Sequence, residues 1–90
     1  MNLSDKITIP TQVMARQVGQ ETVILDLASG TYFGLDPVGA RIWQLMVECK
    51  TLAEVCQSML AEYEVTGEKI EFDVLALAQE LSAKQLISVA

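Results

Sequence analysis

Apolar residues recur with a period close to two from residue 12 to residue 35, and beyond that point the spacing changes to the helical period. Alternating runs that are rich in Val, Ile, Thr and aromatic side chains are typical of β-strands. Gly19-Gln20 and Ser29-Gly30 interrupt these runs where hairpin turns are needed. We therefore predict a three-stranded antiparallel meander over residues 12–18, 21–27 and 31–35.

Helices are expected in the rest of the chain, and residues suited to capping mark where each one begins. Asp36 is a good N-cap, and Pro37 stands at the first helical position, where a missing N–H costs nothing. Thr51 and Glu54 have the spacing of a capping box, and Thr66 can cap a third helix. The expected helix ends are Lys50, Glu64-Val65 and Lys84-Gln85.

Each helix carries an apolar stripe that is expected to face the core. The stripe of the first helix is Val38, Ile42, Leu45, Met46 and Cys49. The stripe of the second is Leu52, Val55, Cys56, Met59, Leu60 and Tyr63. The stripe of the third is Ile70, Val74, Leu77, Ala78 and Leu81. The last apolar segment, which is expected to fold back onto the core, is Leu86, Ile87 and Val89.

Strands followed by helices predict an α+β fold. A trihelical unit with a small attached sheet is typical of a winged helix-turn-helix-like domain, here a three-stranded antiparallel sheet followed by a three-helix bundle. A chain of 90 residues has the length of one domain. We expect that domain to span residues 1–90, with residues 1–6 as a flexible tail.

The net charge of −6, from six Lys and Arg against twelve Asp and Glu, disfavours a nucleic-acid partner. A DNA-recognition helix needs several basic residues, but the third helix has only Lys69 and Lys84. Its acidic residues are Glu68, Glu71, Asp73 and Glu80. DNA binding by a divergent winged helix is therefore the weaker hypothesis, because such a helix would repel phosphates.

Catalysis is not indicated either. The chain has no His, no nucleophile–base pair and no Gly-rich phosphate loop, so we expect no enzyme, no cofactor and no metal site. The acidic residues between positions 62 and 73 are interpreted as a solvated face. Cys49 and Cys56 fall at apolar helical positions and are interpreted as reduced core cysteines, with a disulfide as the less favoured alternative. No signal peptide or membrane-spanning run is recognisable, so a cytoplasmic protein without a membrane partner is expected.

A protein-binding surface is the remaining class, and the third predicted strand offers one. As the last strand of a meander it lies at a sheet edge, where half of its backbone polar groups are unpaired. Alternation places Tyr32 and Phe33 on opposite faces, and the third helix carries Phe72 and Ala76 beside its core stripe. An extended peptide could add to this edge. The alternative is that Tyr32, Phe33 and Phe72 are ordinary core residues.

The residues around this strand resemble those of the PqqD-like family. The resemblance is carried by the run TYFGLDP from Thr31 to Pro37, followed by Gly39 and Ile42-Trp43, and it extends over roughly residues 10–90. It implies a recognition element for ribosomally synthesised and post-translationally modified peptides (RiPPs). Such a domain is not catalytic and binds the N-terminal leader segment of a precursor peptide.

The resemblance also implies a site. The leader would pair antiparallel with the third strand and lie against the third helix. The implied contacts are Thr31, Tyr32, Phe33, Gly34 and Leu35 on the strand and Phe72, Asp73, Ala76, Leu77 and Glu80 on the helix. Asp73 and Glu80 could pair with basic leader residues, and Gly34 would leave room for a close backbone or a bulky leader side chain.

The partners implied by the resemblance are the precursor peptide and the separate leader peptidase or cyclase of a lasso-peptide system, with this chain a monomer or weak dimer. The alternatives are a peptide chaperone of pyrroloquinoline quinone biosynthesis that works with a radical enzyme, and an oligomerisation module that uses the same edge. One position departs from the family, since Gln85 stands where members often have Gly after the third helix. If the backbone is left-handed there, Gln costs about 1 kcal/mol relative to Gly.

Overall fold

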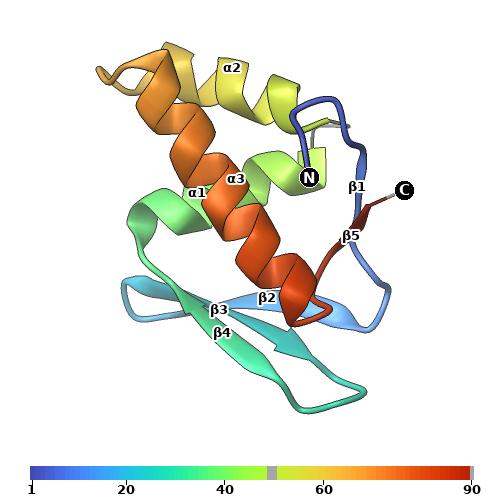
Figure 1. Ribbon diagram of the computed structural model, residues 1–90. Helices are drawn as coiled ribbons and strands as arrows, with labels where there is room; N and C mark the ends of the chain where they lie inside the picture. The colour runs from blue at the N-terminus through green and yellow to red at the C-terminus, as the bar shows by residue number, and fades with distance from the viewer. Residues whose placement is uncertain (49–50, 90) are drawn as a thin grey trace.

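The strands precede the helices in the chain, apart from one short strand at its end (Figure 1). In the computed structural model, which describes residues 1–48 and 51–89, the strands are β1 (Ile7–Thr8), β2 (Val13–Val18), β3 (Glu21–Asp26), β4 (Tyr32–Leu35) and β5 (Ser88–Val89). The helices are α1 (Pro37–Glu48), α2 (Leu52–Glu62) and α3 (Gly67–Ala83). The expected α+β fold, an antiparallel three-stranded sheet followed by three helices, is confirmed.

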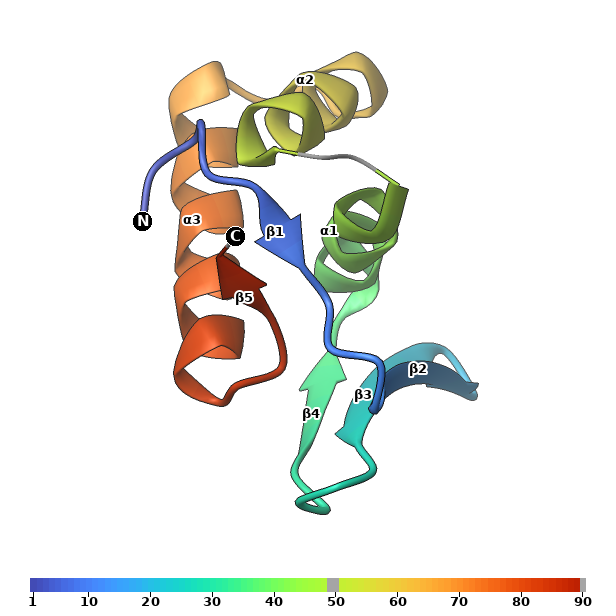
Figure 2. The ribbon, with the colours of Figure 1, turned by 90° about the vertical axis from the view of Figure 1, so that its right-hand side faces the viewer.

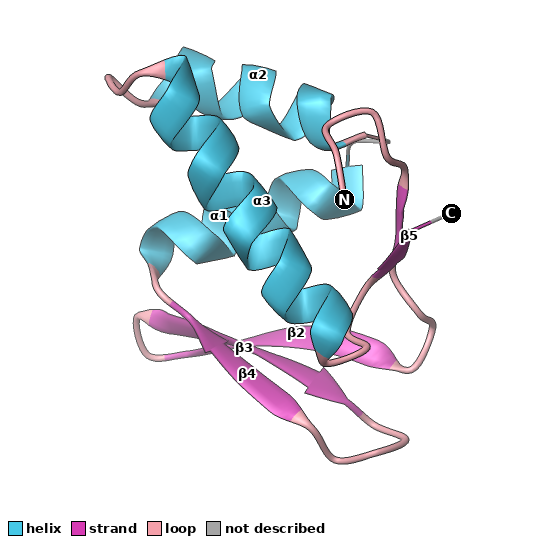
Figure 3. Ribbon diagram, viewed as in Figure 1, coloured by secondary structure: helices cyan, strands magenta, loops and turns pink. Residues whose placement is uncertain are grey.

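The main sheet has the strand order β2-β3-β4, and the three helices all lie on one side of it (Figure 3). Its inner face is set by residues such as Ile24, which is fully buried and lies opposite Phe33 in the register. The next pair along, Leu25 opposite Tyr32, points to the other face. Sequence alternation does not choose the buried face, because β3 carries Ile24 on one face and Val23 and Leu25 on the other. Packing by the helices makes the choice.

The β3–β4 hairpin is held by a buried carboxylate. Asp26 is only 6% exposed, and its Oδ1 accepts a hydrogen bond from the Ala28 N–H at 2.9 Å. Its carbonyl accepts from Gly30, whose φ of +77° suits a residue without a side chain. Asp26 therefore stabilises the turn that positions β4, and the predicted turn at Ser29-Gly30 is confirmed.

The two ends of the described chain lie together, which the sequence did not indicate. β1 pairs antiparallel with β5, and Figure 2 shows this ribbon between α3 and α1. Residues 1–6, for which the sequence predicts a flexible tail, lie against the start of α2. The carbonyls of Leu3 and Asp5 accept hydrogen bonds from the N–H groups of Ala53 and Leu52. This segment thus satisfies two of the donors that any helix leaves free in its first turn.

The predicted caps all form at the helix starts. Asp36 Oδ1 accepts from the Gly39 N–H at 2.7 Å, and Thr66 Oγ1 accepts from the Lys69 N–H at 3.2 Å. Thr51 Oγ1 accepts from the Glu54 N–H at 3.3 Å, which is the N-cap half of the expected capping box. None of the described helices is long and apolar enough to cross a membrane.

The predicted apolar stripes form most of the core, with three errors. Val38 is 40% exposed, Leu60 is 42% exposed and Val89 is 42% exposed, although each was expected inside. Each of the three lies at the margin of its stripe or near a chain end. Such a side chain is buried only if another element packs over it, and the stripe itself does not show whether one does. Trp43, which the stripe of the first helix omitted, is 4% exposed. The returning segment is confirmed at Leu86 and Ile87, which are buried.

The core-cysteine prediction is confirmed for Cys56, which is a free, buried thiol. Desolvation raises the pKa of this thiol, with a smaller contribution from the negative charge of Glu71. A buried thiol kept neutral in this way behaves as a small apolar side chain. Cys49 and Lys50, which were expected at the end of the first helix, lie outside the described residues.

Helix α3 ends in a Schellman motif that requires a left-handed residue. The Leu86 N–H donates to the Leu81 carbonyl at 2.9 Å, and the Gln85 N–H donates to the Ser82 carbonyl at 3.0 Å. Gln85 has a φ of +61°. Leu81 and Leu86, both fully buried, supply the apolar contact that accompanies this motif. The position that departs from the family pattern is therefore one where glycine is favoured.

We predict that Gln85→Gly stabilises the protein. Relief of the left-handed strain outweighs the added flexibility of the unfolded chain, so the free energy of unfolding should rise by about 0.5–1 kcal/mol. Urea denaturation followed by circular dichroism measures this change. The control is Gln79→Gly in the exposed interior of α3, which should lower the same free energy by about 0.5–1 kcal/mol. Equal losses at both positions would contradict the strain at Gln85.

Candidate functional site

A groove of about 520 Å³ runs between β4 and α3 and extends to the first turn of α1. Its floor and walls are mainly apolar, with a few charged side chains at the rim. The residues that line it are Phe33, Gly34, Leu35, Asp36, Val38, Gly39, Ile42, Met59, Tyr63, Val65, Lys69, Ile70, Asp73, Ala76, Leu77 and Glu80. A hollow of this size and character can hold apolar side chains of an extended peptide.

The free edge of β4 forms one lip of the groove. Within the described residues no strand pairs with β4 on the side away from β3. The Asp26 N–H donates to the Thr31 carbonyl, so antiparallel alternation turns the backbone groups of Thr31, Phe33 and Leu35 toward β3. The N–H and C=O groups of Tyr32 and Gly34 then point to the open edge. An added strand would form its main-chain hydrogen bonds with these two residues.

The side chains of β4 divide between two surfaces. Phe33 is half-buried, packs against the core and lines the groove. Tyr32 is 73% exposed on the opposite face of the sheet. The sequence left open whether Tyr32 or Phe33 faces the groove, and in the structure it is Phe33. Lys84, just after α3, places its Nζ 5.8 Å from the centroid of the Phe33 ring, within the range of a cation–π contact.

The turn from β4 into α1 shapes one end of the groove. We call this end, which Val38, Tyr63, Val65 and Lys69 line, the deep end. A Cβ on Gly39 would lie 3.1 Å from Asp36 Oδ1 and 3.4 Å from Leu35 Cδ2, so the turn is too tight there for a side chain without rearrangement. Asp36 is engaged by its capping hydrogen bond to the Gly39 N–H. The fold therefore requires Leu35, Asp36 and Gly39 at this turn, and no contact with a ligand is needed to explain this part of the motif. This geometry agrees with the interpretation of Asp36 as a cap.

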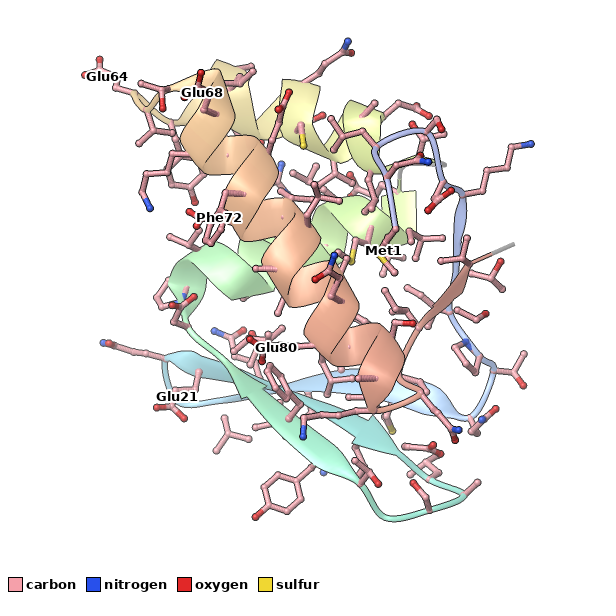
Figure 4. All side chains as sticks on the ribbon, in the orientation of Figure 1. Met1, Glu21, Glu64, Glu68, Phe72 and Glu80 are labelled. Carbon is pink, nitrogen blue, oxygen red and sulfur yellow. The ribbon has the colours of Figure 1, made fainter. Side chains whose placement is uncertain are left out.

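Charged groups at the groove are already partly paired. Lys69 Nζ lies 3.2 Å from Asp73 Oδ2, one helical turn away on α3. Glu80 is exposed further along the same helix, close to the sheet, as Figure 4 shows. Because both groups of the Lys69–Asp73 pair are partly exposed, solvent weakens their attraction. Among the acidic residues of this wall, Glu80 is better placed than Asp73 to meet a new cation.

A bidentate ion pair ties α1 to the end of α2 near the deep end. Arg41 donates from Nε and Nη2 to the two carboxylate oxygens of Glu62, at 2.8 and 2.7 Å. The hydrogen bonds lower the pKa of Glu62 and raise the pKa of Arg41. Both groups face solvent, so the pair fixes orientation more than it adds stability. Tyr63, the next residue, lines the groove.

Most of the residues expected at the site meet in this groove. Phe33, Gly34, Leu35, Asp73, Ala76, Leu77 and Glu80 all line it. Thr31, Tyr32 and Phe72 do not. Tyr32 still contributes its backbone to the edge. Phe72 is 72% exposed, and Figure 4 shows it beside the half of α3 that is remote from the sheet.

The sequence analysis missed the deep end of the groove. Val38, Tyr63, Val65 and Lys69 line it, although the first two were assigned to the core and Val65 to a helix break. Val65 could have indicated this surface, because it is an apolar residue in an otherwise polar connection between two helices. Val65 lines the groove only because that connection lies beside the start of α1, and only the tertiary structure shows this.

Known proteins share both the sequence pattern and the fold of this chain. The family described as Coenzyme PQQ synthesis protein D (PqqD) matches residues 21–87. A solved structure described as TbiB1 in complex with the TbiA(beta) leader peptide is 38% identical, with a TM-score of 0.81 over 90% of this chain and 94% of that chain. Another, described as lasso peptide synthetase B1 complexed with the leader peptide, is 28% identical, with a TM-score of 0.81 over 92% of this chain and 98% of that one. No curated protein gives a significant match.

Proposed function

The chain belongs to the PqqD family, and from that premise we propose that it is a non-catalytic adaptor that binds the leader segment of a ribosomally synthesised precursor peptide. The observation that carries the proposal is the open edge of β4 beside an apolar groove. A leader added to this edge gains main-chain hydrogen bonds from Tyr32 and Gly34 and side-chain contacts from Phe33, Leu77 and the deep end.

The leader is proposed to run antiparallel to β4. Its earlier residues then lie beside Leu35 and the deep end of the groove, and its later residues leave past Tyr32, toward the β3–β4 hairpin. Alternate side chains enter the groove, as the strand period requires. Because a free leader has to become ordered, we expect dissociation constants from about micromolar to tens of nanomolar.

The pathway we propose is lasso-peptide biosynthesis. The two similar structures are described as leader-peptide complexes, and one of these is described as a lasso peptide synthetase B1. The partners would be a leader peptidase and a cyclase, and holding the leader raises the local concentration of the peptide at those enzymes. We place this step in the cytoplasm, where ribosomal precursors are made, with the chain acting as a monomer or weak dimer. Pyrroloquinoline quinone biosynthesis is the alternative that the family description keeps open.

Loss of the Phe33 ring should weaken leader binding. Phe33→Ala removes apolar contact from the groove, and we expect an increase of about tenfold or more in the dissociation constant. Fluorescence polarisation with the labelled leader of the cognate precursor peptide measures it. Phe72→Ala deletes the same ring from an exposed position outside the groove lining and should change the constant by less than about threefold. A larger loss for Phe72→Ala than for Phe33→Ala would contradict this assignment of the groove.

Removal of one edge N–H tests strand addition directly. Gly34→Pro deletes a donor that points away from β3, so the sheet keeps its own hydrogen bonds. A Cβ at Gly34 meets no atom within 4 Å, so Gly34→Ala fits the same position and keeps the N–H. We expect Gly34→Pro to weaken leader binding about tenfold relative to Gly34→Ala, as the loss of one hydrogen bond predicts. Equal affinities in two folded variants would exclude pairing at this edge.

Salt should weaken leader binding if a basic leader residue pairs with Asp73 or Glu80 on the α3 side of the groove. Since Asp73 is already paired with Lys69, most of this effect should come from Glu80. We therefore expect Glu80→Gln to remove more of the salt dependence than Asp73→Asn, in polarisation titrations from low to high NaCl. Salt-independent binding by the unmodified chain would assign recognition to the apolar groove alone.

A further inference from the structure

The main sheet has a second open edge, which belongs to β2. Within the described residues no strand pairs with β2 on the side away from β3, and Figure 2 shows β2 and β4 on opposite sides of β3. The Leu27 N–H donates to the Gln12 carbonyl, so antiparallel alternation turns the backbone groups of the even-numbered residues of β2 toward β3. The N–H and C=O groups of Ala15 and Gln17 then point to the open edge.

A second groove, of about 610 Å³, lies along this edge. β1, the start of β2 and the last turns of α1 line it. Among its lining residues, Trp43 is buried, Val47 is 60% exposed, and the charged side chains are Lys6 and Glu48. An open strand edge beside a groove is the arrangement that accepts an added strand, and here it is repeated on the β2 side of the sheet.

β2 lacks the devices by which proteins keep a sheet edge from pairing. Such devices are a proline, a bulge or a charged side chain that points inward. The register of β2 with β3 is continuous over all six residues of β2, so there is no bulge. Ala15 lies opposite the buried Ile24, so Val13, Ala15 and Gln17 share the groove side, and none of them is charged. Arg16, the one charged residue of β2, is on the outer face.

A second copy of this chain fits the open edge of β2. Two copies related by a twofold axis present the same edge to each other, and the axis makes the two strands antiparallel. With the axis at Ala15, the two Ala15 residues exchange N–H and C=O groups, and Arg16 lies opposite Met14 of the second copy. No like charges meet in this register. An axis at Arg16 would place two guanidinium groups opposite each other, which is unfavourable.

The same symmetry covers an exposed apolar side chain. A twofold axis perpendicular to the sheet keeps the helices of both copies on one side of the joined sheet. The groove along β2 is where α1 presents Val47, so the Val47 side chains of the two copies lie toward each other. Both β4 edges stay at the outer ends of the joined sheet, because β4 is on the other side of β3 from β2.

We propose that two copies of this chain form a dimer by antiparallel pairing of their β2 strands, centred on Ala15, and that this dimer leaves both β4 edges free. This inference goes beyond the proposed function and does not depend on it. Because one short strand pair makes a small interface, we expect a dissociation constant of about 0.1 mM. Each copy carries a net charge of −6, so salt should strengthen the dimer by screening the repulsion between copies.

The experiment measures the mass of the full chain by sedimentation equilibrium, at concentrations from about 10 µM to about 1 mM. Ala15→Pro removes an N–H from the open edge and leaves the hydrogen bonds between β2 and β3 in place. Ala15→Lys places a charge on the groove side of the same edge. The control is Val18→Lys, which adds the same charge on the outer face, at a side chain that is 58% exposed.

We expect the unmodified chain to dimerise within this range. Both Ala15 variants should raise the dissociation constant of the dimer about tenfold or more, and Val18→Lys should change it by less than about threefold. Circular dichroism shows that the compared variants are folded. A chain that is monomeric at the highest concentration would overturn the proposal, and so would a dimer that both Ala15 substitutions leave unchanged in folded protein.

The cognate leader peptide separates the two edges of the sheet. A saturating amount of leader should leave the β2 dimer intact, because the leader is proposed to bind at β4. A dimer that the leader dissolves would assign the contact to β4 and overturn pairing at β2. If the chain dimerises through Ala15 but does not bind the leader, the dimer is supported and the proposed function is wrong.

Discussion

The tight turn from β4 into α1 is the constraint on which the rest of the structure depends. Asp36 accepts a hydrogen bond from the Gly39 N–H, and the absence of a side chain at Gly39 lets Leu35 and Asp36 lie against the first turn of the helix. The chain therefore leaves the sheet and enters α1 without a loop. Helices α1 and α3 then cover the inner face of the sheet and leave the edge of β4 open, so the turn creates the groove as well as the fold.

β4 presents different groups to its two faces and its two edges, because side chains and backbone groups both alternate along a strand. Its odd residues turn their backbone groups toward β3 and their side chains inward, where Phe33 reaches the groove. Its even residues, Tyr32 and Gly34, offer backbone groups to the open edge and face outward. A peptide at the edge is thus in contact with both faces of the sheet.

The acidity of the chain has a narrower role than its net charge of −6 suggests. Two of the acidic residues near the groove already have partners in the fold, since Asp36 caps α1 and Asp73 pairs with Lys69. Glu62 is engaged by Arg41. Glu80 is left as the acidic side chain of the groove wall without a partner among the described residues. The proposed recognition of a leader therefore rests mainly on the strand edge and the apolar groove.

The sequence by itself determined the main sheet and the three helices, because strand alternation, helix caps and turns are local properties. It did not indicate the β1–β5 pairing, which joins segments far apart in the chain. The meander and the caps at Asp36, Thr51 and Thr66 follow from a few neighbouring residues. The left-handed position at Gln85 was suggested only by the departure from the resembled family, and the structure shows it. Tertiary structure decided what local patterns leave equal: which face of β3 is buried, and that Phe33 rather than Tyr32 enters the groove. It also decided that Val38 and Val65 line the deep end, because that surface exists only where α1, α3 and the α2–α3 connection meet.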